Sequence, residues 1–133
     1  LASVSFVKRP SAVPELKDVL RVSMSFLDGK VATATLVYMN SVNWESGAQF
    51  RQQVAASMNI EGAWQTYEGD SDARQMQCRN VIVLAGLFSV GRQRFPFVTI
   101  VDEQADYLRR ARVVEEAVRK AKAAEDRRKA FKP

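Results

Sequence analysis

The stretch VIVLAGLFSVGRQRFPFVTIV, residues 81–101, decides the fold of this chain of 133 residues. It contains two continuous apolar runs, 81–88 and 95–101, with a polar segment at 89–94 between them. Apolar runs without alternation are typical of strands that are covered on both faces. We therefore expect a pair of strands at the centre of the core, joined by a polar turn.

Two residues within these runs predict departures from regular strand structure. Gly86 interrupts the first run, and a glycine inside a strand often marks a bulge or a sharp bend. Pro96 lies in the second run, and proline is confined to strand beginnings and sheet edges because it has no amide hydrogen to donate. The second strand is therefore expected to begin at Pro96 or to lie at an edge.

A β-hairpin is predicted over residues 19–38, because two β-rich runs flank Asp28-Gly29, a preferred pair for a type I′ turn. With this turn, Phe26 lies opposite Val31. The expected core face carries Leu20, Val22, Met24, Phe26, Val31, Thr33, Thr35 and Val37. The other face is expected to be half exposed and carries Arg21, Ser23, Ser25, Ala32, Ala34 and Leu36.

A helix is predicted after the hairpin, over residues 44–59, with Asn43 or Ser46 as its cap. An apolar stripe for packing on the hairpin recurs every four positions, at Phe50, Val54 and Met58. Trp44 at the helix start is more often a core anchor than a platform on which a nucleic-acid base stacks. We therefore expect Trp44 to belong to the core.

Two short elements are predicted between this helix and the central strands. The run at 62–67 favours a short strand, and the acidic segment at 68–72 that follows it favours a solvated loop. Ser71 or Asp72 then caps one or two expected helical turns over 73–77.

The stretch NVIVLAGLFSVGRQRFPFVTIV, residues 80–101, resembles the closing strands of single-strand-binding OB domains. In these domains a strand with a Gly-Leu step leads through a turn into an aromatic-rich final strand, and a short helix precedes the pair. The residues upstream depart from that pattern, because a longer helix follows the second strand. The prediction is therefore an α+β fold, a small and mainly antiparallel sheet with a long basic C-terminal helix. An OB-like β-barrel with a helical extension is the alternative.

The charge of the chain is divided unevenly along the sequence. Residues 1–118 contain 13 Lys and Arg against 13 Asp and Glu, and residues 119–133 contain 7 against 2, which accounts for the whole formal charge of +5. We divide the chain into an extended N-terminal arm at 1–18, a compact α+β domain at 19–102 and a charged helix at 103–133. The body is neutral, and the end of the helix is the cation.

The C-terminal helix also has an apolar seam. The spacing of 4, 3, 4 and 3 residues places Tyr107, Ala111, Val114, Val118 and Ala121 on one side of the helix. This seam is expected to rest on the body or on a partner. Apolar positions thin out after Ala121, and residues 122–132 are expected to project beyond the body.

Several functional classes are disfavoured by what the sequence lacks. The chain contains no histidine and only one cysteine, Cys78, so it lacks His-based catalytic triads and the usual zinc-ligand clusters. No apolar run approaches the roughly 18 residues of a membrane-spanning helix. We expect a non-enzymatic protein without cofactor, metal or small-molecule substrate, in a reducing intracellular compartment, and most specifically in the mitochondrial matrix.

The sequence therefore predicts a non-catalytic structural component of a ribonucleoprotein, in its most specific form an organellar ribosomal protein that contacts rRNA phosphates. The tail resembles the low-complexity helical extensions of ribosomal proteins, and such a subunit also contacts other proteins of a large assembly. The expected RNA-binding residues are Arg119, Lys120, Lys122, Arg127, Arg128, Lys129 and Lys132, with Arg92 and Arg94 in the central turn as weaker candidates. The alternative is a structural subunit of a respiratory or ATP-synthase type of complex, whose seam of Tyr107, Ala111, Val114 and Val118 pairs with another helix.

Overall fold

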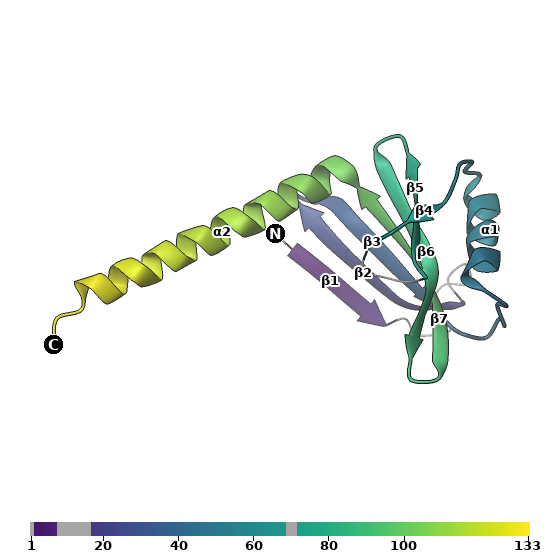
Figure 1. The fold of residues 1–133 in the computed structure, drawn as a ribbon, viewed down its shortest axis with the longest axis horizontal. Coiled ribbons are helices and arrows are strands. Elements are labelled where there is room, and N and C mark those ends of the chain that lie inside the picture. The colour runs from purple at the N-terminus through teal and green to yellow at the C-terminus, as the bar shows by residue number, and fades with distance from the viewer. Residues whose placement is uncertain (1, 8–16, 69–71) are drawn as a thin grey trace.

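The computed structural model describes residues 2–7, 17–68 and 72–133, and for residues 2–7 it describes the backbone alone. In this part of the chain seven strands and two helices occur (Figure 1). In chain order they are β1 (Ala2–Val7), β2 (Val19–Leu27), β3 (Lys30–Tyr38), α1 (Gly47–Met58), β4 (Gln65–Thr66), β5 (Arg74–Cys78), β6 (Val81–Val90), β7 (Gln93–Asp102) and α2 (Glu103–Ala130). The predicted acidic loop and the candidate cap Ser71 fall partly or wholly outside the described residues.

All the described strands belong to one antiparallel sheet, in the order β1-β2-β3-β7-β6-β5-β4. The sheet ends in β1 on one side and in β4 on the other, and these two strands do not pair. The predicted α+β fold with a long C-terminal helix is therefore confirmed, and the OB-like barrel is wrong. Within the predicted arm, β1 joins the sheet as an edge strand beside β2.

The central strand pair forms as the apolar runs predict. β6 and β7 lie inside the sheet, between β5 and β3, and the middle of β6 is buried. The turn between them is shorter than expected, because Val90 pairs with Gln93 and only Gly91 and Arg92 remain unpaired. Arg94, which the sequence places in the turn, lies in β7 opposite Ser89.

No bulge occurs at Gly86, where the ladder with β7 continues without a shift of register. The glycine is needed for a different reason, because a Cβ atom there would lie 3.1 Å from the Cα atom of Ala73 and from the carbonyl oxygen of Asp72. Pro96 is the fourth residue of β7 and not its first. It still has an edge position on one side, because the pairing of β3 with β7 ends at Phe97.

The hairpin forms with Asp28-Gly29 as its turn, and both residues have positive φ, +50° and +76°, as a type I′ turn requires. Phe26 pairs with Val31 as predicted, but a register shift follows, and Ser25 pairs with Thr33 instead of Ala32. The predicted faces are wrong beside this shift. Ala32 is 1% exposed, whereas Val31 is 44% exposed.

Helix α1 begins at Gly47, three residues later than predicted, and Ser46 is its cap. The Ser46 hydroxyl accepts a hydrogen bond from the Gln49 amide at 3.2 Å, and Asn59 ends the helix in the left-handed conformation. The helix packs mainly on β6 and not on the hairpin. The buried core cluster consists of Phe50, Val54, Val83, Ala85, Leu87 and Val98.

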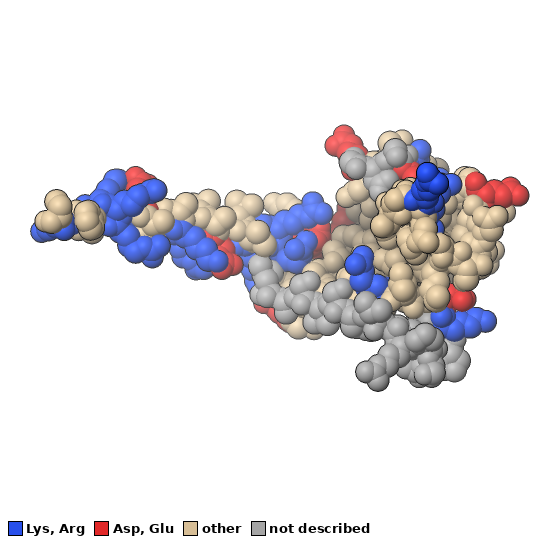
Figure 2. Space-filling view, turned by 90° about the horizontal axis from the view of Figure 1, so that it is seen from below, with Lys and Arg blue, Asp and Glu red and all other residues tan. Residues whose placement is uncertain are grey.

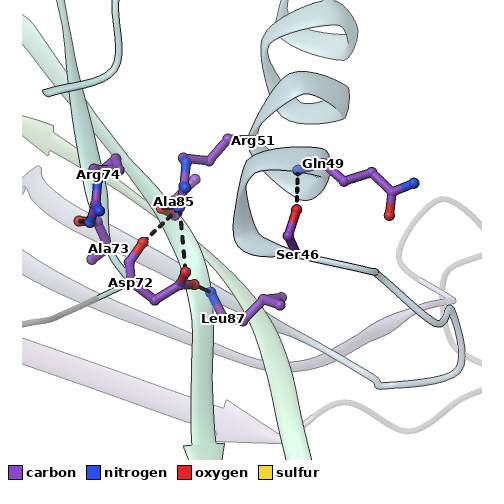
Figure 3. Close-up of polar contacts among 8 residues, drawn as sticks. All are labelled: Ser46, Gln49, Arg51, Asp72, Ala73, Arg74, Ala85 and Leu87. Atoms are coloured by element: carbon purple, nitrogen blue, oxygen red, sulfur yellow. Dashed lines mark hydrogen bonds and ion pairs between the residues drawn. The ribbon is translucent and has the colours of Figure 1, made fainter.

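The helical turns predicted over 73–77 are wrong, because this segment is strand β5 and pairs with β6. The short strand expected at 62–67 contains only Gln65 and Thr66. Figure 3 shows Arg51 reaching from α1 toward the start of β5. Its Nη1 atom donates to the Asp72 carbonyl at 2.6 Å, while the Asp72 carboxylate accepts from the Leu87 amide at 2.5 Å. These contacts hold the segment in extended form against β6.

Candidate nucleic-acid interface

The beginning of α2 is held by its own acidic residues. Asp102 caps the helix and accepts a hydrogen bond from the Ala105 amide at 2.9 Å. Asp106 in the first turn is buried, and its carboxylate pairs with Arg109 at 2.9 Å and with Arg110 at 2.7 Å. Anionic groups at a helix N-terminus are stabilised by the helix dipole. The first two turns are therefore fixed where the helix leaves the sheet.

One ion pair then ties α2 to the β2–β3 turn. Arg112 donates two hydrogen bonds to the Asp28 carboxylate, at 2.8 Å and 2.9 Å, across 84 positions of sequence. The hydrogen bond from Arg112 holds the pKa of Asp28 below its usual value of 3.8, and the same bond raises the pKa of Arg112. Two parallel N–H···O bonds fix orientation as well as distance. The contact ties α2 to the β2–β3 turn, in addition to the packing of the helix on β2, β3 and β7.

Beyond Arg112 the helix projects away from the sheet (Figure 1). All seven tail cations that the sequence singles out, from Arg119 to Lys132, are exposed. Two of them form ion pairs within the helix, Lys120 with Glu116 at 3.0 Å and Lys129 with Glu125 at 2.9 Å. Among the described residues no ion pair engages the other five, which are Arg119, Lys122, Arg127, Arg128 and Lys132.

The tail cations surround the helix and do not form a single stripe. At about 100° of rotation per residue, Arg119 and Arg128 lie on opposite sides, with Lys122 and Arg127 between them. Figure 2 shows blue side chains along both margins of the projecting half. Cations distributed around the helix in this way suit a partner that presents negative charge on more than one side.

The seam predicted for α2 does not rest on the body. Val114 is 62% exposed and Val118 is 64% exposed, and Tyr107 is also exposed, whereas Ala111 is half buried. The structural part of α2 therefore ends near Arg112, and not near Ala121 as the spacing predicts. Val114 and Val118 lie on the same projecting half as the cations (Figure 1).

Arg92 and Arg94 lie at the other end of the sheet, at the β6–β7 turn, so the structure does not bring them together with the tail (Figure 1). Both side chains line a pocket of about 270 Å³. The polar and aromatic residues around this pocket are Asn40, Asn43, Trp44, Arg92, Gln93 and Arg94.

Sequence reasoning missed this pocket because its two halves are distant along the chain. β3 pairs antiparallel with β7, so the loop that follows β3 lies beside the turn that precedes β7. Trp44 in that loop is half buried and packs edge to face on Phe50, with ring centroids 5.3 Å apart. The expectation that Trp44 anchors the core is met, and the same residue also lines the pocket.

A second pocket, of about 520 Å³, lies between α1 and the sheet and is mainly apolar. It is lined by Tyr38, whose pKa is raised by burial.

Within the described ranges no group of three or more acidic or cysteine side chains is arranged to hold a metal ion. Neither described helix combines the length and the apolar character that crossing a membrane requires. Comparisons with protein-family models, with curated proteins and with solved structures find no match for this chain.

Proposed function

We propose that this protein is a non-catalytic, RNA-binding component of a ribonucleoprotein, and that the projecting half of α2 contacts RNA phosphates. The observation that carries the proposal is the set of five exposed tail cations that no ion pair engages among the described residues. In its most specific form, the proposal is that this chain is an organellar ribosomal protein. The basis for this is that the tail resembles the helical extensions of ribosomal proteins.

The physical effect behind the binding is the release of counterions. Lys and Arg side chains that contact phosphates displace condensed cations, so the affinity falls as the salt concentration rises. Because the tail cations surround the helix, we expect α2 to insert between two phosphate backbones and not to lie along one. Phosphate contacts of this kind position a subunit without reading sequence. The neutral body is then available for neighbouring proteins.

The test replaces the five unpaired cations by glutamine, which retains helix propensity. We expect this five-fold variant to bind a structured RNA more weakly than the full chain. Each lost phosphate contact lowers the slope of log affinity against log salt by about 0.7 to 0.9, so five contacts lower it by roughly 3.5 to 4.5. Fluorescence anisotropy over a series of salt concentrations measures this slope.

The matched control is K120Q/K129Q, which removes the two cations that are already paired within the helix. In the full chain these two lysines already donate to Glu116 and Glu125, so they are less available to RNA phosphates. The control therefore lowers the net charge of the tail but removes less phosphate-binding capacity. We expect a smaller change of slope per substitution than in the five-fold variant. Equal affinity and equal slope for the five-fold variant and the full chain would overturn the proposal.

The exposed seam favours a second candidate function, a structural subunit that pairs α2 with a helix of another protein. Val114 and Val118 carry this candidate, because large apolar side chains on a projecting helix are left without cover. If α2 pairs with another helix through apolar contacts, adding about 0.3 M salt changes the affinity of the complex very little, whereas it weakens phosphate binding steeply. The substitution V114S/V118S separates the two, because it weakens helix pairing and leaves RNA affinity unchanged.

A further inference from the structure

We propose that the pocket at the β6–β7 turn binds one unpaired nucleotide, with the base in the pocket and the adjoining phosphates on Arg92 and Arg94. The choice of RNA as the ligand rests on the function proposed above. The site itself is separate from α2, because its residues Arg92, Gln93 and Arg94 are at the β6–β7 turn, and this turn lies at the end of the strands away from the start of α2 (Figure 1).

The charge of the pocket selects an anion. Two guanidinium groups line it, from Arg92 and Arg94, and none of its described lining residues carries a carboxylate. Both arginines are exposed, and no ion pair engages either of them within the described part of the chain. The planar guanidinium forms two parallel hydrogen bonds with phosphate oxygens, which a lysine does not.

The uncharged lining residues match the chemistry of a nucleic-acid base. Trp44 offers an aromatic ring, and its contact with Phe50 holds that ring in place before a ligand arrives. Asn40, Asn43 and Gln93 carry amide groups, each with donors and an acceptor that suit the edges of bases.

The size of the pocket suits one base and not a larger cofactor. Its volume of about 270 Å³ lies below the roughly 300 to 1,000 Å³ of pockets that hold drug-sized ligands. A base in a duplex is stacked and paired, so it does not enter such a pocket. An unpaired base in a loop or a single strand is free to stack on an aromatic side chain. The predicted ligand is therefore single-stranded RNA.

The test uses the fluorescence of Trp44 in the full chain. The substitution W64F leaves Trp44 as the only tryptophan, and this protein is titrated with a single-stranded octanucleotide RNA and with a blunt duplex of the same length. We expect saturable quenching by the single strand alone. We also expect R92Q/R94Q to weaken single-strand binding about tenfold, since base stacking on Trp44 supplies the remaining affinity.

The matched control is K30Q/R79Q, which also removes two positive charges, but from exposed positions of the body outside the pocket. We expect it to weaken single-strand binding less than twofold. Equal losses for the two double variants, or unchanged Trp44 fluorescence, would refute a nucleotide site in this pocket.

Affinities of both variants for one RNA that carries a folded part and a single-stranded extension separate this inference from the proposed role of the tail. Loss of affinity only in R92Q/R94Q refutes the tail contact and supports the pocket. Loss only in the five-fold glutamine variant supports the tail contact and refutes the pocket. If neither variant changes RNA affinity, both proposals fail.

Discussion

At residue 86 the absence of a side chain allows two strands to approach closely. The backbone at Asp72 and Ala73 lies beside Gly86, at distances that a Cβ atom does not normally tolerate. The same Asp72 receives hydrogen bonds from Arg51 of α1 and from the Leu87 amide of β6. One glycine thus makes room for a contact that joins α1, β5 and β6.

The substitution G86A tests this role. We expect it to lower the free energy of unfolding by about 1 to 3 kcal/mol, because two of the three nearest atoms belong to the backbone and cannot rotate away. Urea denaturation measures the change. The control is G91N, because Gly91 has a positive φ that asparagine tolerates and no atom within 4 Å of an added Cβ. A loss in G86A no larger than in G91N would contradict the packing role.

Among the elements, α2 depends on very few contacts for its direction. Its first turns are fixed by Asp102 and Asp106, and the bidentate pair between Arg112 and Asp28 follows. This pair is exposed, so salt screens it and it adds little to global stability. We expect its effect to be geometric, because a bidentate pair holds α2 at a defined angle to the sheet.

The titration of Asp28 gives a prediction about this angle. The folded-state pKa of Asp28 lies below 3.8, so the pair is fully formed above pH 3.8 and is lost as the pH falls through the folded-state value. We expect the distribution of distances between a label on the body and a label near residue 128 to broaden on acidification.

Energy-transfer measurements on single molecules report this distribution. The control is D28N, which lacks the carboxylate and is expected to give the broad distribution already at pH 7. A narrow distribution for D28N at pH 7 would show that the helix direction is set elsewhere. High salt at pH 7 is expected to broaden the distribution of the unchanged chain in the same direction.

The whole molecule carries its two proposed RNA contacts at opposite ends. The helix α2 has 28 residues and is therefore about 42 Å long, at 1.5 Å of rise per residue. The pocket is lined by residues at the β6–β7 turn, and this turn lies at the end of the strands away from the start of α2 (Figure 1). If both proposals hold, a short RNA reaches one site only, whereas a longer RNA bridges both.

Bridging predicts avidity that depends on RNA length. We expect the full chain to bind an RNA of about 40 nucleotides, with a folded part for the tail and a single-stranded part for the pocket, at least 100-fold more tightly than a single-stranded octanucleotide, within the range usual for two linked sites. When either site is removed, we expect the longer RNA to keep only a statistical advantage, because it offers more positions at which the remaining site can bind. Anisotropy titrations of R92Q/R94Q and of the five-fold tail variant measure the effect. The same length preference in all three proteins would exclude bridging.

The features that the sequence predicted are those that depend on neighbouring residues. The apolar runs at 81–88 and 95–101 identified the central strands, Asp28-Gly29 identified the hairpin turn, and Ser46 was one of two predicted caps for α1. The separation of charge between body and tail is likewise a property of the sequence. Propensity, periodicity and capping act over a few residues, so they can be read before any fold is known.

The features that only the tertiary structure decided depend on contacts between distant parts of the chain. The bulge beside Ser25 changed the hairpin faces, and the segment at 73–77 became strand β5 because pairing with β6 outweighs the weak helix preference of five residues. The pairing of β3 with β7 placed Trp44 beside Arg92 and created the pocket. Strand order and register are set by long-range packing and hydrogen bonding, which no local pattern encodes.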